Sequence, residues 1–123
     1  MSRASILLPL LLVVAGCGST DSSSDAGTTF TKPVVINTGD TLGYVSTALS
    51  GDGGAFVSWI EEGEKSSSAM VRLVSPAGVA GPPLKVAEGS RASLGYPRLV
   101  HAGTETWIAW GDAKTGVKTA QLK

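Results

Sequence analysis

The stretch LGYVSTALSGDGGAFVSWIE (residues 42–61) recurs in altered form as LGYPRLVHAGTETWIAWGD (residues 94–112). When the two LGY tripeptides are aligned, FVSW (56–59) falls opposite WIAW (107–110) after a slip of one residue. The flanking segments align as well, so the two copies lie about 50 residues apart. A period of this length indicates that one supersecondary unit is present twice in the chain.

Each copy contains four short runs with the composition of β-strands, separated by Gly, Asp and Pro residues that favour chain reversal. The runs are 33–37, 44–50, 55–61 and 69–75 in the first copy, and 83–87, 96–102, 106–112 and 117–122 in the second. In the third run of the first copy, Val57 and Trp59 point to one side of a strand, and Phe56 and Ile60 point to the other. A strand that is apolar on both faces is expected to be covered on both faces.

The sequence therefore predicts an all-β domain at residues 31–123, built from two four-stranded antiparallel units at 33–82 and 83–123. Four antiparallel strands with a doubly covered inner strand are typical of a β-propeller blade. Propellers usually contain about four to eight blades, whereas this sequence has two copies of the unit. Three arrangements account for two units: closure of one propeller by several chains, a piece of a longer propeller, or two sheets packed as a sandwich.

The run SGDGG (50–54) resembles the first half of the Asp box, Ser-x-Asp-x-Gly-x-Thr-Trp, which marks the blades of sialidase-like propellers. Phe56 and Val57 stand where that family has Thr and Trp. The resemblance implies a glycoside-hydrolase type of propeller, in which three arginines hold a carboxylate and a tyrosine is the nucleophile. The arginines and tyrosines beyond residue 30 match that set in number but lie in no matching motif, so no catalytic role is carried over.

Composition excludes several classes of function. The 123 residues allow one small domain, and ten Lys and Arg balance ten Asp and Glu, so the chain lacks the basic excess typical of nucleic-acid binding. A zinc site needs more Cys or His than Cys17 and His101 supply. We therefore expect no nucleic-acid partner, no metal and no cofactor.

Residues 1–16 carry the three-part pattern of an export signal. A positive start with Arg3 precedes the apolar run ILLPLLLVVA (6–15), which ends at small residues. This run is too short for a membrane span, which needs about 20 apolar residues. The polar segment that follows, GSTDSSSDAGTT (18–29), has no apolar period and is expected to form a flexible tether.

The residues Val14-Ala15-Gly16-Cys17 resemble the lipobox of bacterial lipoproteins. The resemblance implies that the thiol of Cys17 receives diacylglycerol, that the signal is cut just before this residue, and that the new amine is acylated. A thiolate is a good nucleophile, and more than one acyl chain gives durable anchoring. In that family an Asp after the cysteine retains the protein in the inner membrane. Gly18 here implies the outer membrane of a cell that has one, with the periplasmic or surface face left open. Residues 17–30 are then the lipidated cysteine and its tether.

No catalytic residue is predicted. His101 has no serine, cysteine or carboxylate motif beside it to make it a general base, and the carboxylates fall in or beside expected turns. Trp59 and Trp110 occupy equivalent positions of the repeat and are predicted to lie in the core. Trp107 has no tryptophan at the equivalent position of the first copy and is a candidate for stacking on a sugar. Together with Arg98 and His101, it makes up the candidate ligand-binding set.

These observations predict a lipid-anchored, exported cell-envelope protein whose β-repeat domain is a non-catalytic binding or structural module. Its expected partners are the membrane, through the lipid on Cys17, a glycan or protein ligand, and further copies of itself. The alternative is a fragment or oligomerising subunit of a sialidase-like, glycoside-hydrolase-type propeller, whose active site forms between chains.

Overall fold

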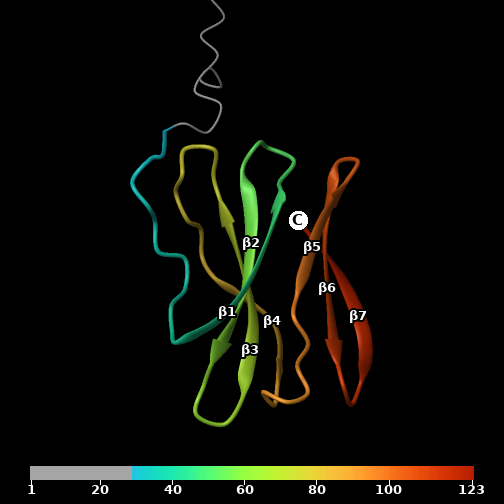
Figure 1. Ribbon diagram of the computed structural model, residues 1–123. Coiled ribbons are helices and arrows are strands. Elements are labelled where there is room, and N and C mark those ends of the chain that lie inside the picture. The colour runs from blue at the N-terminus through green and yellow to red at the C-terminus, as the bar shows by residue number, and fades with distance from the viewer. Residues whose placement is uncertain (1–28) are drawn as a thin grey trace, which may run out of the picture. The chain divides into compact units, whose positions relative to one another are not determined.

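Seven β-strands and no helix form the part of the chain that the structure describes, residues 29–123 of a computed structural model (Figure 1). The predicted signal peptide (1–16), Cys17 and most of the tether (17–30) lie outside the described residues. Residues Lys32–Lys123 form one compact unit. None of the described residues forms a helix with the length and apolar character that a membrane crossing takes. The strands are β1 (Thr41–Leu49), β2 (Ala55–Glu62), β3 (Ser67–Val74), β4 (Leu84–Gly89), β5 (Arg98–Ala102), β6 (Glu105–Asp112) and β7 (Gly116–Leu122).

The strands form two antiparallel sheets, which confirms the all-β prediction. One sheet has the order β1-β2-β3-β4 and the other has the order β5-β6-β7, so each strand pairs with its neighbour in the sequence (Figure 1). Short turns make this order possible. Ala102 pairs with Glu105, so Gly103 and Thr104 are the whole loop between β5 and β6. Gly103 has a φ of 63°, and a positive φ at the first loop position is what a type II′ hairpin turn requires.

The strand pairing preserves the internal repeat. Residues that the LGY alignment placed opposite one another occupy the same positions in the two sheets. Between the first two strands of each sheet, Ser46 pairs with Ser58 in the first sheet, and the equivalent Arg98 pairs with Ala109 in the second. Between the second and third strands, Phe56 pairs with Leu73 in the first sheet, and the equivalent Trp107 pairs with Gln121 in the second. Strands β1, β2 and β3 therefore correspond to β5, β6 and β7.

The prediction of two four-stranded units is wrong in its allocation of strands, because one sheet has four strands and the other has three. Residues 33–37, expected to begin the first unit, form no strand. Residues 83–87, expected to begin the second unit, lie almost entirely in β4, which pairs with β3 and completes the first sheet. The physical reason is sequence order: β4 follows β3 after a chain reversal, whereas no described strand precedes 33–37. The first sheet therefore extends past the expected boundary at residue 83.

The main core lies between the two sheets. Phe56 and Val71 of the first sheet are buried against Ile108 of the second, which has no exposed surface. Removing a side chain of this size from water contributes about 1.5–3 kcal/mol. Two hydrogen bonds also join the sheets: the Leu99 amide donates to Ser46 Oγ (3.1 Å), and Thr106 Oγ1 donates to the Leu49 carbonyl (2.7 Å). The described residues thus form two sheets packed face to face, and each of the three arrangements considered from the sequence contains such a contact.

The outer face of the first sheet is covered by the segment that precedes β1. Trp59 lies on the face opposite Phe56 and is only 2% exposed, so the expected burial of both faces of β2 is confirmed for this residue. Arg72 donates from Nη1 to the Ile36 carbonyl (2.7 Å). The carboxylate of Glu61 accepts hydrogen bonds from the amides of residues 38 and 39 and from Trp59 Nε1. These polar contacts hold residues 36–39 over the sheet without forming a strand.

Candidate functional site

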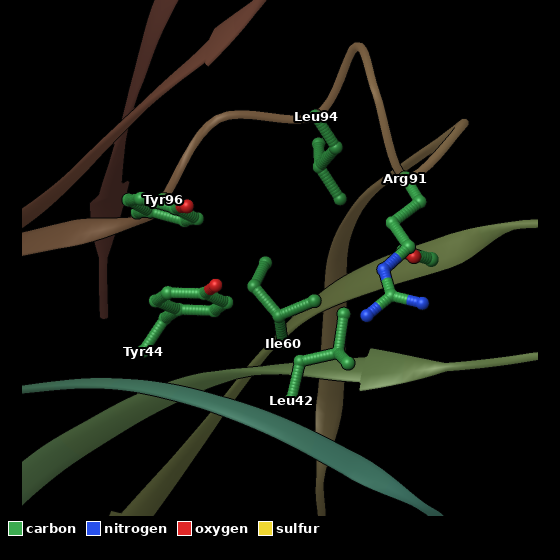
Figure 2. Close-up of a pocket in the computed structure, with 7 residues that line it drawn as sticks. Leu42, Tyr44, Ile60, Arg91, Leu94 and Tyr96 are labelled. Carbon is green, nitrogen blue, oxygen red and sulfur yellow. The ribbon is translucent and has the colours of Figure 1, made fainter.

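The two LGY tripeptides, far apart in the sequence, meet in the fold. The rings of Tyr44 and Tyr96 stack with their centres 3.9 Å apart and their planes 14° from parallel. Figure 2 shows the two rings lying one above the other with both hydroxyl groups on the same side. About half of each side chain is exposed. The internal repeat therefore places a pair of half-exposed phenol rings where the two sheets approach one another.

The backbone beneath Tyr44 is unusual. Gly43 and Tyr44 have φ values of 81° and 55°, and Tyr44 is the only non-glycine residue with a positive φ among residues 29–123. The pairing of β1 with β2 shifts register on both sides of Gly43. A non-glycine residue in the left-handed region costs about 1–2 kcal/mol, and such conformations cluster at binding and switch sites. The bulge and its strain therefore mark Tyr44 as a residue to consider for function.

A small cavity of about 170 Å³ opens beside the tyrosine pair. Its floor is apolar and consists of Leu42, Ile60 and Leu94, of which the last two are buried. Figure 2 shows these side chains between the tyrosines and Arg91. Arg91 lines the opposite wall and donates from Nη1 to a carboxylate oxygen of Glu62 at 2.8 Å. We call this cavity, with its tyrosine pair, the LGY cleft.

The LGY cleft also contains a buried serine hydroxyl with no hydrogen-bond partner among the described residues. Ser67 lines the cavity and is 2% exposed, and its hydroxyl has no hydrogen-bond partner within the described residues. A buried polar group without a partner costs about 1–3 kcal/mol. Because the serine hydroxyl both donates and accepts, it is available to a ligand that enters the cleft.

The Tyr96 phenol is un-ionised at physiological pH, because its pKa lies above the ordinary value of 10.0. The hydrogen bond with Tyr44, and the repulsion that two neighbouring phenolates would feel, raise the pKa of Tyr96 above its ordinary value of 10.0. The cleft therefore offers a guanidinium, two phenol hydroxyls and one serine hydroxyl above an apolar floor. This set suits a small ligand with several hydroxyl groups or a carboxylate and one apolar face, as in a sugar or an acidic sugar.

The structure does not bring the three predicted ligand-binding residues together. Arg98 and Trp107 lie on the face of the second sheet turned away from the first sheet, while His101 lies on the face turned toward it, as the alternation of side chains requires. The His101 ring shares a 2.9 Å hydrogen bond with Thr106, whose hydroxyl proton is already donated to Leu49. Thr106 therefore accepts, and His101 carries its proton on Nδ1. Cys17 lies outside the described residues.

The Asp-box-like run SGDGG forms the turn between β1 and β2. The carboxylate of Asp52 accepts a hydrogen bond from the Ser50 hydroxyl and another from the Gly54 amide (3.0 Å). These two hydrogen bonds lower the pKa of Asp52 below its ordinary value of 3.8. A Cβ atom at Gly54 would clash with the Val74 carbonyl oxygen, so only glycine fits there. Asp52 therefore has a structural role in closing the turn.

Within residues 29–123, no three His, Cys, Asp or Glu side chains are grouped in a way that could hold a metal ion. Tyr44, Tyr96 and Ser67 were not identified as site residues from the sequence. The recurrence of LGY was the available signal, because a repeated tripeptide with a conspicuous aromatic residue suggests a shared structural position. No family model, curated protein or solved structure matches the chain.

Proposed function

We propose that this chain is an exported lipoprotein of the cell envelope, anchored through Cys17, whose β domain is a non-catalytic binding module. The observation that carries the proposal is the sequence Val14-Ala15-Gly16-Cys17 at the end of a short apolar run that begins after Arg3. Small residues before a thiol are what lipidation and cleavage need, and Gly18 favours the outer membrane of a cell that has one.

Labelling of the full chain with palmitate in bacterial cells tests the anchor. Wild type incorporates the label and partitions into the membrane fraction, whereas Cys17→Ala loses both properties. Ser22→Ala is the matched control, because it changes one small residue of the same segment and keeps the lipobox. Label that survives Cys17→Ala, or no label on wild type, rules out the anchor.

The binding role is assigned to the LGY cleft. The support for it is the combination of the stacked Tyr44 and Tyr96 rings, the exposed guanidinium of Arg91 and the unpartnered hydroxyl of Ser67. The proposed ligand class is a small glycan, and an acidic sugar is favoured because Arg91 forms charge-assisted hydrogen bonds with a carboxylate.

Calorimetric titration of the full chain with glucuronate and with glucose tests this assignment. We expect glucuronate to bind more tightly, and Arg91→Gln to remove that preference. Arg98→Gln is the comparison variant, since Arg98 is an exposed arginine that does not line the cavity beside Arg91 but a separate pocket against the same two tyrosines. If Arg98→Gln removes binding and Arg91→Gln does not, the ligand site is on the Arg98–Trp107 face instead. If neither sugar binds, the glycan assignment is wrong.

The alternative is an oligomerising subunit of a glycoside-hydrolase-type propeller. The observation that favours it is the four-stranded antiparallel order of β1-β2-β3-β4, which is the strand order of a propeller blade. A panel of chromogenic glycosides tests it with the full chain. Hydrolysis by wild type that disappears in Glu62→Gln, which removes the carboxylate paired with Arg91, would replace the binding module with an enzyme.

A further inference from the structure

The internal repeat assigns a structural counterpart to residues 33–37. The alignment from the sequence places Pro33–Asn37 over Pro83–Ala87, most of which lies in β4. Strand β4 pairs with the outer edge of β3, and β7 is the counterpart of β3. By this equivalence, residues 33–37 correspond to a strand that would pair with the outer edge of β7. In the described residues they form no strand, and no described strand pairs with that edge of β7.

Residues 33–37 and the open edge of β7 both carry exposed apolar side chains. Val34 and Val35 are 53% and 76% exposed, and Val117 at the start of β7 is 82% exposed. The backbone N–H and C=O groups on an open sheet edge form a template for another strand. Residues 33–35 are thus available for pairing, while the hydrogen bonds described above hold the chain at residues 36–39.

The faces of the two sheets are related in the same way. Trp110 is the counterpart of Trp59, and it faces the first sheet, where it packs against the core. Phe56 also lies in that interface, and its counterpart Trp107 lies on the far face of the second sheet. The interface between the two sheets therefore joins the Phe56 face of the first sheet to the Trp110 face of the second sheet. Two faces lie outside this interface: the Trp107 face of the second sheet, and the Trp59 face of the first sheet, which residues 36–39 of the same chain already cover.

We propose that a second copy of this chain completes the second sheet. Residues 33–35 of that copy pair with the open edge of β7, as β4 pairs with β3, while its residues 36–39 stay hydrogen-bonded over its own first sheet. The contact uses different surfaces on the two chains, so it propagates head to tail until the assembly closes into a ring or continues as a fibre. This proposal does not depend on the lipid anchor or on the ligand of the LGY cleft.

The register of β3 and β4 fixes which residues meet. Met70 pairs with Lys85, and their counterparts are Lys118 and Val35. Val71 pairs with Leu84, which places Thr119 opposite Val34.

Cysteine cross-linking of full-length chains tests the proposal. Two differently tagged chains, one with Val35→Cys and one with Lys118→Cys, are co-expressed and mildly oxidised. Directly opposite residues of antiparallel strands have Cα atoms about 4.5–5.5 Å apart, which is within the range that a disulfide spans. We expect a mixed-tag, disulfide-linked dimer. Replacing Lys118→Cys with Val79→Cys, on an exposed loop residue outside β7, gives the matched control.

The proposal requires the Val35–Lys118 product to exceed the Val79 control by about tenfold, because disulfides form only within a narrow Cα distance. Equal yields of the two products, or no product from either pair, overturn it. A doubly substituted chain that cross-links within itself also overturns it, because the edge of β7 is then completed by its own residues 33–35. Each variant co-expressed with wild type identifies any product that arises from Cys17 instead.

Discussion

Replacement of Ile108 by alanine tests the packing of the two sheets. Ile108 has no exposed surface and contacts Phe56 and Val71 across the interface, so truncation leaves a cavity that neighbouring strands cannot easily fill. An Ile→Ala change at such a position costs about 2–5 kcal/mol. One kcal/mol lowers the melting temperature of a domain of this size by about 4–8 °C, so we expect a decrease of about 8–40 °C. Ile108→Val, which keeps most of the side chain, should cost about 0.5–1.5 kcal/mol.

The assay is thermal unfolding of the full chain, followed by tryptophan fluorescence at one protein concentration. Val79→Ala is the matched control, because Val79 is 65% exposed, and a surface substitution changes stability by about 0.5 kcal/mol or less. If Ile108→Ala and Val79→Ala lower the melting temperature equally, the side chain of Ile108 is not buried between two sheets. The face-to-face arrangement would then be refuted.

Four further predictions follow from individual contacts. Ser67→Ala should raise the free energy of unfolding by about 1 kcal/mol in denaturant titration, because it removes a buried hydroxyl that has no partner; a loss of stability would show that the hydroxyl is satisfied. Gly54→Ala should destabilise the fold by about 1–3 kcal/mol, because the added Cβ would meet a carbonyl oxygen. Gly111→Ala is the control and should cost less than about 1 kcal/mol, because there is open space around Gly111. Equal costs for the two variants would contradict the close contact at Gly54. Burial raises the pKa of Glu61, but hydrogen bonds from residues 38, 59 and 39 outweigh burial and hold this pKa below 4.5. The contribution of Glu61 to stability is therefore present above about pH 4.5 and is lost as the pH falls through the folded-state pKa. Glu61→Gln should flatten the dependence of unfolding free energy on pH in this range, and an unchanged dependence would exclude the contribution. Val35→Lys should leave the melting temperature within about 3 °C, because the residue is exposed, yet reduce the mass of any assembly measured by light scattering; an unchanged mass would argue against pairing through residues 33–35.

The sequence was sufficient to predict the strands and their repeat, because both depend on local patterns. The alternation around Trp59 and the glycine-rich turns predicted the second strand of each sheet, and for β2 it also predicted burial on both faces. The allocation of the outer strands was not predictable in this way. Residues 33–37 and 83–87 have similar composition, and only the presence of a preceding strand to pair with makes the second one a strand.

The candidate site was predicted less well, because it depends on contacts between distant residues. Tyr44 and Tyr96 meet only after two sheets have packed, and the left-handed conformation of Tyr44 has no signature in its residue type. The separation of His101 from Arg98 was available from the sequence. Residues three apart in a strand point to opposite faces, so the two side chains could not share a site on one face.

Mass spectrometry of the N-terminal peptide from membrane-extracted protein tests the proposed function most directly. We expect the mature chain to begin at Cys17, with diacylglycerol on the sulfur of this residue and an acyl chain on its amine. A mature chain that begins at another residue, or a Cys17 with a free thiol, would contradict the proposed lipid anchor.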